Sequence, residues 1–177
     1  MLLDRDGTLN VDLTSGVQCV EDFRPIPGAF EAVGRLCRAG WPVSIVTNQS
    51  ILARGWASAE TVEAIHRECA RLAAEHGGRF DSIYVCPDLP ESDSPRRKPR
   101  PGMLFEAATD HGYDLFRSYM IGDSAGDLVA GRAAGATPLL VLTGKGWRTR
   151  EERGHPPEHT FPDLAEAVDW ILGNRGG

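Results

Sequence analysis

The sequence has 177 residues, of which 41% are hydrophobic and 25% charged, and its formal net charge at pH 7 is -6. A chain of this length buries roughly 70% of the surface that its unfolded form exposes, so its core needs no disulfide or metal. The acidic balance argues against a protein that coats nucleic acid or a membrane surface, because both attract positive charge. No apolar run approaches the roughly 20 residues of a membrane span and no secretory signal is visible, so we expect a cytoplasmic protein.

The first half of the chain alternates strand and helix patterns. Two leucines at 2–3 predict a very short first strand, and apolar side chains at helical spacing predict a helix over 28–39, which Gly40 ends. A segment rich in β-branched residues predicts a strand over 41–47. A helix over 58–76 follows, with a serine at its expected N-cap.

The second half continues the alternation. A third strand at 80–86 is followed by a polar, proline-rich loop over 87–99. The remaining predicted elements are a helix at 101–110, a strand at 118–121, a helix at 125–134, a strand at 137–142 and a helix at 164–172 behind an Asp163 cap. This order predicts an α/β, Rossmann-like three-layer sandwich with a central parallel sheet, in a single domain over residues 1–177.

Side chains suited to catalysis follow the first four predicted strands. They are Asp4 and Asp6 after the first strand, Thr47 after the second, Lys98 beyond the third, and Asp123 and Asp127 after the fourth. Ligands of such sheets bind beyond the carboxyl ends of the strands, so these side chains are expected at one edge. Like charges 4 Å apart repel by about 4 kcal/mol at an effective dielectric constant of 20, so the cluster must bind a cation or hold a proton. Oxygen ligands without His or Cys favour Mg²⁺ over zinc.

The motifs around these residues resemble those of the haloacid dehalogenase superfamily of phosphotransferases. The matching segments are Asp-Arg-Asp-Gly-Thr-Leu at 4–9, the isolated threonine at 47, Lys-Pro at 98–99 and Gly-Asp-(x)3-Asp at 122–127. They occur in the family's order and cover nearly the whole chain. The resemblance implies a core with this fold and a phosphate-transferring active site.

The resemblance also implies roles for individual residues. Asp4 would be the nucleophile that forms an aspartyl-phosphate, and Asp6 would act first as general acid and then as general base. Mg²⁺ would be held by Asp4, the backbone carbonyl of Asp6 and Asp123, while Thr47 and Lys98 would hold the phosphoryl oxygens.

Asp127 keeps two interpretations at this point. It supports the metal-bound waters or Lys98, or it is a carboxylate favoured near the N-terminus of a helix.

Further segments resemble the D-glycero-D-manno-heptose 1,7-bisphosphate phosphatases and the related histidinol-phosphatases, which have no separate cap domain. The segments are Asn10 after the first motif, Pro-Gly at 27–28, Thr-Asn-Gln-Ser at 47–50, Arg-Lys-Pro at 97–99, Pro-Gly-Met at 101–103 and Thr-Gly-Lys at 143–145. The implied reaction removes the C7 phosphate on the route to nucleotide-activated heptose. The alternatives are a histidinol-phosphate phosphatase and, in another class, a catalytically silent protein that binds a phosphorylated ligand.

The same resemblance implies the substrate contacts. They are Asp12 and Ser15 in a flap over 10–23, Asn48, Gln49 and Ser50 after the second strand, and Arg97 beside the lysine of the third motif. The implied partner is a small phosphorylated metabolite, and we expect a monomer that binds neither nucleic acid nor membranes.

Two departures from the family pattern affect these expectations. Many members hold a structural zinc on three cysteines and one histidine in the loop after the third strand. Here Cys86 alone stands at a ligand position, Asp88 replaces the histidine and no Cys-x-Cys precedes Arg97, so we expect no structural zinc and a buried Cys86 thiol. The second departure is Ser124, which stands where heptose enzymes usually have lysine.

The basic run at 96–100 has three interpretations. Arg96 and Arg100 suit a solvated loop, whereas Arg97 could bind a second anionic group of the substrate with its two-pronged guanidinium. A nucleic-acid contact is disfavoured, because no aromatic side chains for base stacking lie nearby in the sequence. Trp147, in a glycine-rich segment after the fifth strand, is expected to pack half-buried or else to flank the substrate.

Overall fold

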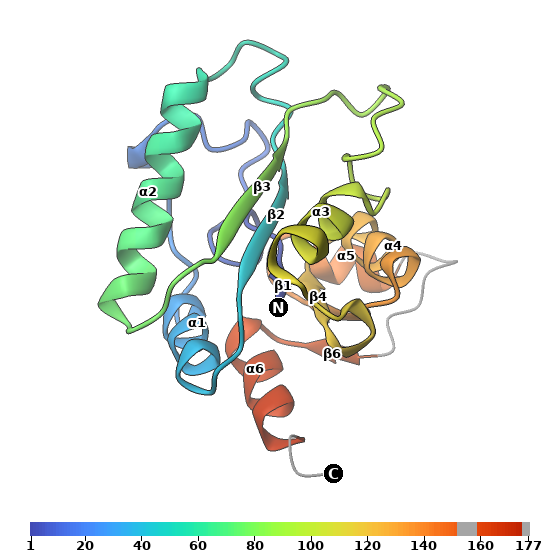
Figure 1. Ribbon diagram of the computed structural model, residues 1–177. Helices are drawn as coiled ribbons and strands as arrows, with labels where there is room; N and C mark the ends of the chain where they lie inside the picture. Colours follow the sequence, from blue (N-terminus) through green and yellow to red (C-terminus); the bar gives the residue numbers. More distant parts are fainter. Residues whose placement is uncertain (152–158, 175–177) are drawn as a thin grey trace.

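The computed structural model describes residues 1–151 and 159–174. Within these residues, six parallel strands form a sheet with the order β3-β2-β1-β4-β5-β6 (Figure 1). The strands are β1 (Leu2–Leu3), β2 (Ser44–Asn48), β3 (Ser82–Cys86), β4 (Tyr119–Gly122), β5 (Thr137–Val141) and β6 (His159–Phe161). The predicted α/β, Rossmann-like fold is confirmed.

Helices cover both faces of this sheet and complete the three layers. They are α1 (Ala29–Arg38), α2 (Ala59–Glu75), α3 (Gly102–His111), α4 (Ala125–Ala134), α5 (Gly146–Glu151) and α6 (Leu164–Gly173), with short 3-10 helices η1 (Val20–Asp22) and η2 (Leu115–Arg117). One apolar core joins the sheet to α1, α2 and α6, and a second joins it to α3 and α4 (Figure 1). None of the helices in the described part of the chain is long and apolar enough to cross a membrane.

The predicted helix starts are confirmed by their caps. Ser58 accepts a hydrogen bond from the backbone N–H of Thr61 at 3.1 Å, and Asp163 accepts one from the N–H of Glu166 at 3.0 Å. Each side chain satisfies a donor that the first helical turn leaves without a partner. The predicted bounds of α2 and α6 therefore agree with the structure to within one residue at either end.

Strand β1 has only two residues, yet it lies at the centre of the sheet. Leu2 is fully buried and pairs with Ser44 of β2 on one side and Met120 of β4 on the other. The backbone N–H of Asp4 extends this pairing with a 2.9 Å hydrogen bond to the carbonyl of Ile121. The first motif therefore leaves the sheet at the middle of its carboxyl edge.

Four short elements were not predicted from the sequence: the 3-10 helices η1 and η2, helix α5 and strand β6. Helix α5 and strand β6 follow β5, and both are short, with six and three residues. Helix α5 buries Gly146 and Thr149, whereas Trp147 is 59% exposed and has the Arg150 guanidinium 5.6 Å from its ring centroid. The expected half-burial of Trp147 is not observed: its side chain is exposed, while Gly146 and Thr149 are the buried residues of this short helix.

Candidate active site

The site is built first on the tight turn that follows β1. The carbonyl of Arg5 accepts hydrogen bonds from three backbone N–H groups, those of Thr8, Leu9 and Asn10, with N···O distances of 3.2, 2.8 and 3.2 Å. Gly7 has a φ of +85°, and a Cβ there would lie 2.0 Å from a carboxylate oxygen of Asp123, which follows β4. Glycine at this position therefore permits both the left-handed turn and the close approach of the fourth motif.

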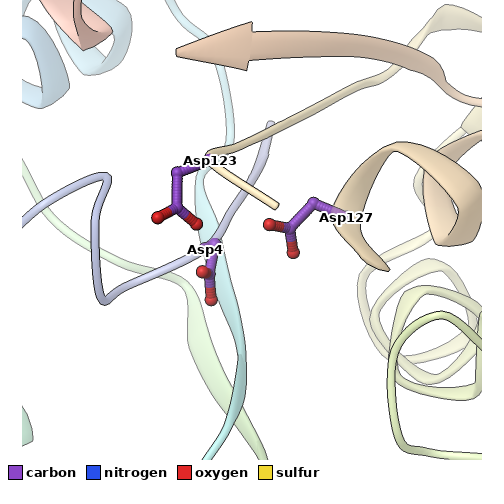
Figure 2. A group of neighbouring side chains, drawn as sticks. All are labelled: Asp4, Asp123 and Asp127. Atoms are coloured by element: carbon purple, nitrogen blue, oxygen red, sulfur yellow. The ribbon is translucent and has the colours of Figure 1, made fainter. Parts of the chain in front are cut away.

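Three aspartates from the first and fourth motifs meet at the carboxyl edge of the sheet. Asp4, Asp123 and Asp127 each offer a carboxylate oxygen, and these oxygens lie within 4.8 Å of one another (Figure 2). All three side chains are buried. Burial raises the pKa of Asp4 to about 7 and that of Asp123 to about 8, from 3.8; neighbouring carboxylates add to both shifts, and Lys98 opposes the first. A hard divalent cation such as Mg²⁺ fits this group of oxygen ligands.

Lys98 supplies a positive charge within this group. Its Nζ lies 2.8 Å from Asp4, 2.6 Å from Asp127 and 2.7 Å from the carbonyl of Val46. Burial alone would lower the pKa of this ammonium, but the two carboxylates outweigh it and raise the pKa. One ammonium against three carboxylates leaves the group negatively charged when all are ionised, which again favours a bound cation.

Asn48 holds the backbone that carries this lysine. Its Nδ2 donates to the carbonyl of Lys98 at 3.0 Å, and its Oδ1 accepts from the N–H of Lys98 at 3.2 Å. Gln49 donates to Asp6 at 2.8 Å and to Thr47 at 2.9 Å. Both side chains were predicted as substrate contacts. In this structure they line the cleft and bind other residues of the site.

The carboxylate of Asp6 is surrounded by donors. It accepts from Nε and Nη2 of Arg5 at 3.0 and 2.9 Å, from Asn10 at 2.8 Å and from Gln49 at 2.8 Å. Burial would raise the pKa of Asp6, but the charge and hydrogen bonds of Arg5 outweigh it and lower the pKa. Asp6 is therefore ionised in this structure, whereas the raised pKa values of Asp4 and Asp123 favour their protonated forms when no metal is bound.

Asp127 uses both of its oxygens within the protein. Oδ2 accepts from the backbone N–H and the hydroxyl of Ser124 at 3.0 and 2.6 Å, completing a capping box at the start of α4, and Oδ1 lies 2.6 Å from Lys98. Of its two interpretations, this geometry favours support of Lys98, and the helix N-terminus explains why the side chain is held there.

A cleft of about 450 Å³ opens above this group. The predicted site residues that line it are Asp4, Asp6, Asp12, Ser15, Thr47, Asn48, Gln49, Ser50, Arg97, Lys98 and Asp123. A volume of this size suits a small molecule. Part of the predicted flap, including Asp12 and Ser15, lies along the cleft as expected.

Lys145 links the flap to the acidic group, a role that the sequence did not reveal. Its Nζ forms an ion pair with Asp12 at 2.8 Å, and its backbone N–H donates to Asp123 at 2.7 Å. The signal that could have found it is the Thr-Gly-Lys segment directly after β5, at the same edge of the sheet.

Comparison with known proteins agrees with this geometry. Residues 95–167 match a family model described as HAD-hydrolase-like. The sequence is 43% identical over 175 residues to the D-glycero-beta-D-manno-heptose-1,7-bisphosphate 7-phosphatase of Pseudomonas aeruginosa, a match that covers 97% of each chain. The chain belongs to this phosphatase family of the haloacid dehalogenase superfamily.

Solved structures of the heptose bisphosphate phosphatase family have the same fold. The enzyme of Bordetella bronchiseptica, described as complexed with magnesium and phosphate, is 39% identical with a TM-score of 0.93, over 98% of this chain and 97% of that one. The enzyme of Burkholderia thailandensis is 35% identical with a TM-score of 0.76, over 98% of this chain and 97% of that one. The resemblance inferred from the motifs is therefore confirmed.

The loop after β3 differs from the zinc-binding pattern expected of many members of this family. Cys86 is buried, as predicted, and its Sγ lies 3.4 Å from Asp88 and 3.9 Å from the hydroxyl of Ser94. Burial raises the pKa of this thiol. Arg97 donates to the carbonyl of Asp88, so the loop is tied to the residue beside Lys98.

In the basic run of this loop, Arg96 and Arg100 form ion pairs and keep exposed side chains, as the solvated-loop interpretation predicts. Arg96 forms an ion pair with Glu106 of α3 at 2.8 Å, and Arg100 forms one with Asp93. The guanidinium of Arg96 binds both oxygens of Glu106 on α3, and its side chain is 39% exposed.

Proposed function

We propose that this chain is a cytoplasmic, Mg²⁺-dependent phosphomonoesterase that removes the C7 phosphate of D-glycero-D-manno-heptose 1,7-bisphosphate in heptose biosynthesis. The observation that carries the proposal is the buried group of Asp4, Asp123 and Asp127 around Lys98, at the edge of the sheet where the cleft opens. Membership of the heptose bisphosphate phosphatase family supports the choice of substrate.

The reaction divides between two carboxylates. Asp4 attacks phosphorus, so that a bond forms between its oxygen and phosphorus while the bond from phosphorus to the C7 oxygen breaks. Asp6 is ionised in this structure, so it must first take up a proton from solvent. It gives this proton to the C7 oxygen and then takes one from the water that hydrolyses the phosphoaspartate. Mg²⁺ held by Asp4, the carbonyl of Asp6 and Asp123 would neutralise the repulsion between a carboxylate and a phosphate dianion.

Lys98 and Thr47 hold the phosphoryl oxygens in this proposal. Lys98 is fixed by Asp127 and the carbonyl of Val46, and its third N–H, which contacts Asp4 in this structure, would turn to a phosphoryl oxygen. Thr47 is 1% exposed and accepts a hydrogen bond from Gln49, which leaves its hydroxyl proton available for a phosphate oxygen.

Specificity is assigned to the rim of the cleft. Asp12, Ser15, Ser50 and Arg97 line it together with Asn48 and Gln49, and the guanidinium of Arg97 is the group suited to the second phosphate. The loop that carries Arg97 is proposed to keep its shape without zinc, through Cys86, Asp88 and Ser94. The single domain, the monomeric state and the absence of nucleic-acid or membrane partners stay predictions.

The proposed substrate is tested by steady-state kinetics on heptose 1,7-bisphosphate and histidinol phosphate, with Arg97→Ala and its neighbour Arg100→Ala as control. The bisphosphate should be preferred, and Arg97→Ala should lower its kcat/KM by about tenfold to a hundredfold, because a charge-assisted hydrogen bond is lost. Arg100→Ala should change little, since Arg100 pairs with the exposed Asp93.

Other kinetic outcomes would change the proposed substrate, the proposed role of Arg97 or the proposed activity itself. A preference for histidinol phosphate would replace the proposed substrate, and an equal loss on both substrates would remove Arg97 as the selector. Absence of turnover on these substrates and on an aryl phosphate with Mg²⁺ would favour the catalytically silent binding protein.

A further inference from the structure

Directly behind the proposed general acid lies a fully buried arginine. The side chain of Arg5 is 0% exposed, although arginine is almost never buried without partners. Its guanidinium binds both oxygens of Asp6 on one side, and on the other its Nη1 lies 3.1 Å from Nε2 of His66, 61 residues away in α2. The guanidinium thus bridges the active-site turn and a helix of the adjacent layer.

The chemistry of arginine settles the direction of the second contact. A guanidinium has five N–H donors and no acceptor, so Nε2 of His66 must accept, and the ring proton must be on Nδ1. Burial and the adjacent charge of Arg5 lower the pKa of His66 to about 4, which agrees with a neutral ring in this position. Leucine at position 66 would leave the buried Nη1 without this acceptor.

The direction of the Asp6 carboxylate depends on this guanidinium. Each oxygen of Asp6 accepts two hydrogen bonds, and one of each pair comes from Arg5; the others come from Asn10 and Gln49. Two parallel bonds from a planar guanidinium fix the plane of a carboxylate more closely than single bonds do. A shift of Arg5 would therefore turn the carboxylate of Asp6.

From these contacts we propose that His66 is a positioning residue: by accepting from Arg5 it fixes the guanidinium that sets the orientation of Asp6 for proton transfer to the leaving oxygen. The inference rests on the proposed function, in which Asp6 is the general acid. His66 touches neither substrate nor reacting atoms in this scheme.

The test compares two leaving groups in His66→Leu and His66→Gln. The alkoxide that leaves a sugar phosphate needs a proton, whereas the nitrophenolate of 4-nitrophenyl phosphate leaves without one. In His66→Leu, kcat/KM for the sugar bisphosphate should fall by about tenfold or more, and that for 4-nitrophenyl phosphate should stay within about threefold, since general-acid catalysis contributes about 10²–10⁴ to the first. His66→Gln should recover most of the loss, because its amide oxygen can accept from Arg5.

His76→Leu is the matched control, because His76 lies at the end of the same helix, and its activity should be unchanged. Arg5→Lys, which keeps the charge but not the paired bonds, should reproduce the His66→Leu pattern, so the test stands if one of these variants does not fold.

Equal losses on both substrates with no recovery in His66→Gln would mean a purely structural contact and would overturn the proposal, as would full activity of His66→Leu. Failure of the proposed function can be distinguished from failure of the role proposed for His66, because in the first case the unaltered protein would not hydrolyse the sugar bisphosphate.

Discussion

At the scale of single residues, the position of the proposed nucleophile concentrates opposing charges. Asp4 is buried next to Asp123 and Asp127, and Lys98 is the cation that contacts it directly. Its raised pKa follows from burial, and a bound cation would return it to the ionised form that attacks phosphorus. In the proposed mechanism, the chemistry of this position thus depends on both a lysine and a metal.

The Asp4→Asn variant should lose Mg²⁺-dependent phosphate release by at least about a thousandfold, because the amide cannot form the bond to phosphorus. Phosphate release measures the activity, and circular dichroism checks that the fold is kept. Asp93→Asn, at an exposed carboxylate in the loop after β3, is the control and should retain activity. Undiminished turnover in Asp4→Asn would refute the assignment of the nucleophile.

Gly7→Ala should weaken Mg²⁺ binding by about tenfold or more, as found when the groups that support metal ligands are disturbed. The added Cβ would lie 2.0 Å from Asp123, and Asp123 would have to move. Gly40→Ala is the control, because Gly40 shares the positive φ, at +78°, but has no atom within 4 Å of its added Cβ. Isothermal titration calorimetry with Mg²⁺ measures the difference. Equal affinities in the two variants would contradict the prediction.

At the scale of elements, helix caps were predictable and short elements were not. Ser58 and Asp163 begin α2 and α6 as predicted, since a cap and a helix of ten or more residues both leave a signal in the sequence. Helix α5 and strand β6 were missed, because six and three residues are too few to show a period. The two-residue β1 was predicted from Leu2 and Leu3, directly before the first motif.

The two serine caps give a matched pair of variants. Ser58→Ala and Ser124→Ala should each lower the free energy of unfolding by about 1 kcal/mol, the usual cost of a lost cap. Ser124→Ala alone should also lower phosphatase activity. The Ser124 hydroxyl donates to Oδ2 of Asp127, and this contact holds the carboxylate whose other oxygen, Oδ1, lies beside Lys98. Urea denaturation and phosphate release measure the two effects. Activity that is equal in the two variants would show that Asp127 needs no support from its cap.

At the scale of the whole molecule, the acidic group couples stability to pH and metal. Without metal, the pKa values of Asp4 and Asp123, about 7 and 8, lie above the value of 3.8 for an unfolded chain. The folded state therefore binds more protons between these limits, and the stability that these two groups contribute is lost as pH rises through about 7 to 8. Protons also compete with Mg²⁺ for the same oxygens.

Adding Mg²⁺ should therefore raise Tm more at about pH 8.5 than at about pH 6, because the two carboxylates bind the metal in their ionised form. Thermal unfolding with and without Mg²⁺ at both pH values measures this. Asp123→Asn is the comparison variant, in which the difference between the two pH values should shrink. A rise in Tm that is larger at the lower pH would contradict this prediction.

The sequence by itself determined which chemistry the protein carries and at which edge it gathers. Asp4, Thr47, Lys98 and Asp123 follow successive strands, and parallel strands bring such residues together whatever the details of packing. The tertiary structure alone decided which of these groups pair. The contact of His66 with Arg5 spans 61 residues and depends on how deeply α2 packs, whereas a helical pattern in the sequence indicates only a face.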